Sequence, residues 1–328
     1  MPHLHKALTL AVSNSHQPII TMRNIYTLFF LTILLACNET QNKRTNTAHS
    51  DTTTVANSTK SFDVLNEYKQ FVSKLDTFDV ETATIAAKKY QELFQNEDEA
   101  IKDEAFVIFN THYEELHKNI NELHEKDTTN FDPLIMLDAS GKGLPVSKKL
   151  REYNDRLKRN GFEVSSTEGI SYIQQDRNFI AKYFYTYISA TMKEFLEQLN
   201  KENKEGFRED AGLTIETKQY VNRLVWWDNF IKKNGGFISI DKARENRKFF
   251  LTFFVQGMDN SPVISYETNT LDDYYKTAYA YLQNNFPNSE TNKIVNPYFK
   301  ALLQKNKTKA TALLNEYKKT GVIIDFGQ

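Results

Sequence analysis

The stretch that decides the fold covers residues 174–200 and reads QQDRNFIAKYFYTYISATMKEFLEQLN. Its apolar side chains recur every three or four residues, which is the spacing of one helical face. They are Phe179, Ile180, Tyr183, Phe184, Tyr187, Ile188, Met192, Phe195, Leu196 and Leu199. An apolar face this wide is buried by more than one neighbouring element. The stretch therefore predicts a long core helix.

Helical periodicity continues outward from this stretch over nearly the whole chain. Residues 249–255 read FFLTFFV, which is apolar on every face and predicts a fully buried segment. Gly is scarce, at 11 of 328 residues, which disfavours a turn-rich β architecture. We expect an all-α fold of about ten helices, with helical hairpins stacked as a compact bundle or a short α-solenoid. No sheet is expected, although residues 237–240 could form a short extended piece.

Several helix starts carry recognisable signals. Asp79 and Ser147 are expected as N-caps, because a short polar side chain accepts a bond from a free backbone N–H there. Thr270 is expected to cap another helix, with Asp273 three residues later. Asn296 precedes Pro297, and this pair predicts a helix whose first residue is the proline. Residues 322–324 are expected to fold back onto the body.

Residues 127–146 interrupt the periodicity. The interruption contains four helix breakers, which are Pro133, Gly141, Gly143 and Pro145. It predicts a linker between an N-terminal helical part, residues 61–126, and a C-terminal helical domain, residues 147–328.

A short stretch near residues 271–305 resembles a tetratricopeptide-like repeat. Ala278-Tyr279-Ala280-Tyr281-Leu282, followed by Phe286-Pro287, is similar to the end of that repeat's second helix. No second copy lies at the repeat spacing of about 34 residues. The resemblance implies stacked helical hairpins and carries no function.

Residues 22–36 have the pattern of a secretory signal. Arg23 is followed by the uncharged run IYTLFFLTILLA, residues 25–36, which is shorter than the roughly 20 residues of a membrane-spanning helix. The run ends in Leu34-Leu35-Ala36-Cys37, which resembles the lipobox of bacterial lipoproteins. The resemblance implies cleavage before Cys37 and acylation of Cys37, including a fatty acid such as palmitate. More than one acyl chain would anchor the protein stably in a bilayer.

The flanking segments complete this organisation. Residues 1–21 make an unusually long head for such a signal, and we attribute them to a misplaced start codon. Residues 38–60 are mostly Thr, Asn and Ser, and this composition predicts a flexible tether. We expect a cell-envelope protein held on the cell membrane or outer membrane, facing the periplasm or the exterior.

Composition excludes several kinds of chemistry. Lys and Arg number 41 against 42 Asp and Glu, so no basic excess indicates a nucleic-acid partner. Cys37 is the only cysteine, so the mature domain has no disulfide and no thiolate ligand. Of the histidines beyond residue 60, His112, His117 and His124 all fall on one predicted helix. His112 lies on its apolar stripe and is expected to be packed, and we expect neither a metal site nor a cofactor.

Two pairs of residues are candidates for a functional site. Glu168 and Asp228 are the carboxylates best placed to act as an acid pair, since paired carboxylates hydrolyse glycosides without a metal or histidine. Trp226 and Arg223 could line a binding groove, whereas Trp227 belongs to the core stripe.

The leading hypothesis is a non-catalytic lipoprotein whose helical domain binds a protein, a peptide or a cell-wall polymer. One alternative is a carboxylate-based hydrolase of envelope glycans, and the other is a structural spacer without a ligand. The bilayer itself is a partner through acylated Cys37.

Overall fold

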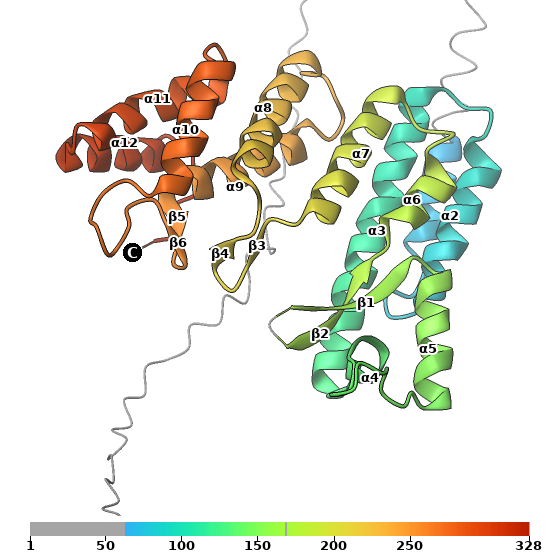
Figure 1. Ribbon diagram of the computed structural model, residues 1–328. Helices are drawn as coiled ribbons and strands as arrows, with labels where there is room; N and C mark the ends of the chain where they lie inside the picture. The colour runs from blue at the N-terminus through green and yellow to red at the C-terminus, as the bar shows by residue number, and fades with distance from the viewer. Residues whose placement is uncertain (1–62, 168, 328) are drawn as a thin grey trace, which may run out of the picture. The chain divides into compact units, whose positions relative to one another are not determined.

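The computed structural model describes residues 63–167 and 169–327. All of them belong to one compact unit of the chain, Asp51–Gln328. This described part is mostly helical, which confirms the all-α class (Figure 1). The expected signal peptide, Cys37 and the tether lie outside the described residues.

Five helices come first along the described chain. They are a helix over residues 63–72, α2 (Glu81–Phe94), α3 (Glu99–Lys126), α4 (Asp132–Ile135) and α5 (Lys148–Arg159). Helices α2 and α3 pack together as a hairpin. Tyr90 and Phe94 of α2 are fully buried, as are Phe109 and Tyr113 of α3. This aromatic core holds α6 as well, because the Phe184 ring lies 4.4 Å from the Phe109 ring and 4.8 Å from the Tyr90 ring, centroid to centroid.

The predicted helix over residues 174–200 is wrong in its extent. The chain forms β2 (Ile170–Gln175), then α6 (Arg177–Phe184), then α7 (Ala190–Glu205). The break follows from a buried carboxylate: Asp103 accepts bonds from the Ser189 backbone N–H at 2.9 Å and from its hydroxyl at 2.6 Å. Ser189 in turn caps α7 by accepting from Met192 N.

Short antiparallel hairpins occur where no sheet was expected. The longest pairs β1 (Phe162–Thr167) with β2, with Phe162 opposite Gln175. An α3 side chain fixes it, because the Asn121 amide accepts from Ile173 N and donates to Ile173 O. Two smaller hairpins pair β3 (Arg208–Glu209) with β4 (Gly212–Leu213) and β5 (Gly257–Met258) with β6 (Ser261–Pro262).

The C-terminal helices stack as successive hairpins, as expected. They are α8 (Thr217–Lys233), α9 (Ile240–Gln256), α10 (Asp273–Asn285), α11 (Glu290–Leu303) and α12 (Lys307–Lys319). Buried tyrosines link them: Tyr220 donates to Phe250 O at 2.6 Å, and Tyr279 donates to Phe254 O at 2.5 Å. Each hydroxyl bonds a helical carbonyl of α9, so these rings fill the core without leaving a polar atom unpaired.

Some helix boundaries differ from expectation. Pro297 lies inside α11 rather than at its first residue, and Ser289 is the N-cap. Asp272, not Thr270, caps α10. The expected extended piece at residues 237–240 is a turn that leads into α9. Residues 322–324 do return to the body, since Ile323 is buried.

Candidate functional site

Histidines 112 and 117 of α3 serve as structural contacts. His112 is buried, as expected, and its Nε2 lies 3.0 Å from the Thr82 hydroxyl. His117 Nε2 lies 2.8 Å from Ile173 O in strand β2. Burial lowers the pKa of both imidazoles, since it penalises their charged forms. They therefore join α3 to α2 and to the hairpin.

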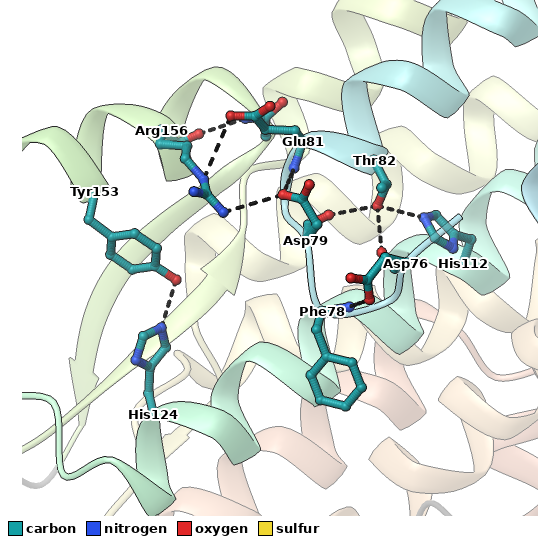
Figure 2. Close-up of polar contacts among 10 residues, drawn as sticks. Asp76, Phe78, Asp79, Glu81, Thr82, His112, His124, Tyr153 and Arg156 are labelled. Carbon is teal, nitrogen blue, oxygen red and sulfur yellow. Dashed lines mark hydrogen bonds and ion pairs between the residues drawn. The ribbon is translucent and has the colours of Figure 1, made fainter. Parts of the chain in front are cut away.

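His124 joins the end of α3 to α5. Figure 2 shows its Nε2 directed at the Tyr153 hydroxyl, 2.6 Å away. Its Nδ1 lies 3.0 Å from the Thr129 hydroxyl, and its ring packs edge-on against buried Phe131. Both ring nitrogens are thus engaged, and burial lowers the pKa of this histidine as well.

A polar network surrounds the start of α2 (Figure 2). The Asp79 carboxylate accepts from Glu81 N at 3.1 Å and lies 3.3 Å from Arg156 Nη2 of α5. It thus bonds a free N–H of the first turn, although Val80 occupies the N-cap position itself. The hydroxyl of Thr82 lies 2.7 Å from Asp79 O. The network ties the loop before α2 to α5 and leaves the Phe78 ring 55% exposed.

Asp228, a candidate acid, is buried between three helices. Its Oδ1 accepts from Arg247 Nε at 2.5 Å, and its Oδ2 accepts from Thr291 N at 2.7 Å. Both oxygens are thus occupied, by α9 and by the N-terminus of α11. Glu168, the other candidate, lies outside the described residues, so the hydrolase hypothesis stays a prediction.

Arg223, a candidate binding residue, lies in the interior of the α8 packing at 2% exposure. Its Nη2 donates to Glu205 and to Gly206 O, both at 3.0 Å. Its guanidinium carbon lies 4.9 Å from the centroid of the Phe250 ring. A ligand on the surface does not reach this guanidinium.

Trp226 is partly buried and packs against two aromatic neighbours. Its ring lies nearly parallel to Phe230, with centroids 5.0 Å apart, and edge-on to Trp227 at 4.9 Å. One face of the indole is therefore covered by its own helix. Its role in ligand binding stays a prediction.

A buried carboxylate that sequence reasoning missed lies between α7 and α8. Glu202 Oε1 accepts from Trp227 Nε1 at 2.8 Å and from Gln198 Nε2 at 2.7 Å, and lies 3.9 Å from Arg223 Nε. Burial raises the pKa of Glu202 to about 7. A signal did exist, because Glu202 follows Phe195 and Leu199 at helical spacing on the apolar face of α7.

A surface groove lies between α2, the end of α5 and α6. Its floor contains the buried side chains of Asn160, Phe179 and Tyr183. Four cationic residues line it: Lys88, Lys158, Arg159 and Lys182. We call this feature the α2–α5–α6 groove. A depression with a basic rim is the arrangement of a binding surface for an anionic ligand.

A second depression adjoins this groove across α2. It lies between the helix over residues 63–72 and α2, and it shares Ile85 and Lys88 with the first. It is lined by Lys74, Lys88 and Lys89 against Glu67 and Glu92, and both acids lie close to Lys89, at 3.1 Å and 3.0 Å. Three cations against two carboxylates leave a smaller excess of positive charge than four against two, so the α2–α5–α6 groove is the stronger candidate.

No three His, Asp or Glu side chains of the described residues are grouped so that they could hold a metal ion. None of the described helices has the length and apolar character needed to cross a membrane. Comparison of the chain with protein-family models, with curated proteins and with solved structures gives no match.

Proposed function

We propose that the protein is a lipid-anchored lipoprotein of the cell envelope with a non-catalytic binding domain. Acylated Cys37 holds it on the membrane, and the helical domain binds a protein, a peptide or a cell-wall polymer. The proposal for the anchor rests on Leu34-Leu35-Ala36-Cys37. The observation that carries the binding activity is the α2–α5–α6 groove with its basic rim.

The segment between Cys37 and the helical domain is long enough to hold the groove away from the bilayer surface. Residues 38–60 would reach at most about 80 Å from the bilayer when fully extended. The α2 helix, which contributes Lys88 to the groove, begins at Glu81, shortly after the first described residue. A domain tethered in this way samples the space next to the membrane and meets partners at a raised local concentration.

The proposal is tested with the chain from Asp51 onward, which contains every residue of the compact unit. This chain is incubated with purified cell-wall sacculi and, separately, with cross-linked envelope extracts. We expect pelleting with sacculi, or capture of one envelope protein, without release of soluble wall fragments.

Release of glycan fragments, detected by mass spectrometry, would contradict a non-catalytic role. The matched controls are Glu168→Gln and Asp228→Asn. Release that disappears in either variant, with circular dichroism and the Tm showing that the variant is folded, would assign a hydrolase. If the chain neither pellets with sacculi nor captures an envelope protein, a structural spacer without a ligand is the better description.

A further inference from the structure

The rim of the α2–α5–α6 groove carries more cations than carboxylates. Among the described residues, none of Lys88, Lys158, Arg159 and Lys182 forms an ion pair. The carboxylates of the groove are Glu81 and Asp176. Four cations against two carboxylates leave a positive surface.

Both carboxylates are already engaged. Asp176 caps α6, where its Oδ1 accepts from the backbone and side-chain nitrogens of Asn178, each at 2.9 Å. Glu81 lies 3.8 Å from Arg156 Nε. Both acids keep their negative charge, so four cations against two carboxylates give the groove a formal excess of two positive charges, which attracts an external anion.

The cations are held by packed elements rather than by a loose loop. The Thr84 hydroxyl of α2 donates to Arg159 O at the end of α5, at 3.3 Å. Gln91 of α2 donates to Tyr183 O at the end of α6, at 3.0 Å. These two bonds fix the three helices around the groove, so the backbone positions of the rim are set before a ligand arrives.

The floor argues against a sugar as the ligand. Sugars are bound by an exposed aromatic face, but Tyr183 is only 9% exposed. Lys182 Nζ lies over its ring, 5.0 Å from the centroid, and the Phe179 ring lies 4.6 Å away. No open aromatic platform remains, whereas carboxylates would meet ammonium and guanidinium groups on three sides.

The concave shape argues against a bilayer surface. Lys88 comes from α2, Lys158 and Arg159 come from α5, and Lys182 comes from α6, so the cations surround a depression. A flat layer of headgroups contacts protruding side chains, while a single extended chain can enter a groove. The arrangement thus fits a narrow, acidic, chain-like ligand.

We infer that the α2–α5–α6 groove binds an extended acidic peptide segment, whose carboxylates pair with Lys88, Lys158, Arg159 and Lys182. The inference deepens the proposed function, on which it rests, by naming the chemistry of the ligand. Because the rim is exposed to solvent, the ion pairs are screened by salt, and binding should weaken steeply as ionic strength rises.

The test uses the chain from Asp51 onward and fluorescein-labelled octaglutamate, with octaglutamine as the neutral probe. Fluorescence anisotropy should show binding of octaglutamate only, weakened at high salt. The double variant Lys88→Glu/Lys158→Glu should bind octaglutamate at least about tenfold more weakly, since two attractive charges become repulsive. Circular dichroism and the Tm verify that it folds.

The matched control is Lys300→Glu/Lys319→Glu, which makes the same change in net charge on exposed positions of α11 and the end of α12. It should bind octaglutamate within about twofold of the wild type. An equal loss in both double variants would overturn the inference, because binding would then follow net charge alone. Absence of octaglutamate binding, or binding only to phosphatidylglycerol vesicles or polyphosphate, would overturn it too.

Failure of this inference is distinguishable from failure of the proposed function. If sacculi or an envelope protein are still bound while octaglutamate is not, the binding domain stands and the acidic ligand is wrong. If nothing is bound in any assay, both the acidic ligand and the proposed binding function are wrong.

Discussion

Glu202 is a carboxylate placed in phase with the apolar residues of α7, and at 8% exposure it is buried. Two neutral donors, Trp227 and Gln198, satisfy its Oε1. The cost of burying its charge remains, and it raises the pKa to about 7. This residue therefore makes stability depend on pH.

We predict that Glu202→Gln removes this dependence. The pKa of the folded state, about 7, lies above the ordinary value of 4.5, so the native state binds the extra proton between these values. The free energy of unfolding of the wild type therefore decreases as pH rises through this range, by the contribution of Glu202. The amide oxygen can still accept both bonds, and Arg223 keeps Glu205. The free energy of unfolding of the variant minus that of the wild type should be about 1–3 kcal/mol larger at pH 8 than at pH 5.

Urea unfolding of both proteins at pH 5 and pH 8 measures this difference. The histidines whose pKa burial lowers are present in both proteins, so their contribution cancels. An identical stability difference at the two pH values would show that Glu202 does not titrate as described.

Gly161 is a residue whose replacement should be costly. Its φ is +86°, and a Cβ there would lie 2.5 Å from Phe179 Cγ and 2.7 Å from the Tyr113 hydroxyl. Gly161→Ala should lower the free energy of unfolding by about 2–4 kcal/mol, because backbone strain and overpacking add.

Gly141→Ala is the control for Gly161→Ala. Gly141 has a φ of +79° with nothing within 4 Å of the added Cβ, so it isolates the backbone strain, at about 1 kcal/mol. Chemical denaturation measures both variants. Equal losses would show that the contact with Phe179 and Tyr113 is unimportant.

Residue environments were predictable from the sequence where periodicity decides them. His112 and Trp227 fall on apolar stripes and are buried as expected. Arg223 was predicted to line a groove with Trp226, but the sequence does not reveal that Glu205, 18 residues away, receives its guanidinium. Burial of a charge depends on its partner, and partners are set by tertiary structure.

At the scale of the elements, the break between α6 and α7 shows where periodicity fails. Tyr187 and Ile188 continue the apolar spacing through the break, so a single helix was the natural expectation. The chain turns because Ser189 meets the Asp103 carboxylate, which is 86 residues away in sequence. The start of α11 also depends on a distant carboxylate, because Asp228 of α8 accepts from Thr291 N in its first turn. The helix therefore begins before Pro297, where the local sequence predicted its start.

Ser189→Ala should therefore destabilise the protein more than loss of a cap alone. Loss of an N-cap costs about 1 kcal/mol, and removal of the hydroxyl also leaves a buried oxygen of Asp103 without its partner, for a total of about 2–3 kcal/mol. Ser147→Ala is the comparison, because Ser147 caps α5 at an exposed position. Thermal and urea unfolding of both variants checks this, and a Ser189 effect no larger than that of Ser147 would refute the role of Asp103.

For the whole molecule, the all-α class and the stacked hairpins followed from composition and periodicity. The α2–α5–α6 groove did not, because it is assembled from three segments, residues 81–88, 158–160 and 176–183. Each of its lysines looks in the sequence like an ordinary solvated residue. The excess of cations over carboxylates in the groove is visible only after the helices have been brought together.

We propose that a lipid anchor at Cys37 carries this groove on the membrane. To test this, the full chain and its Cys37→Ala variant are expressed in bacteria supplied with labelled palmitate, and the cells are fractionated and the products analysed by mass spectrometry. We expect a labelled, membrane-bound product that begins at Cys37, and no label in the variant. An unlabelled wild type, or equal labelling of the variant, would contradict it.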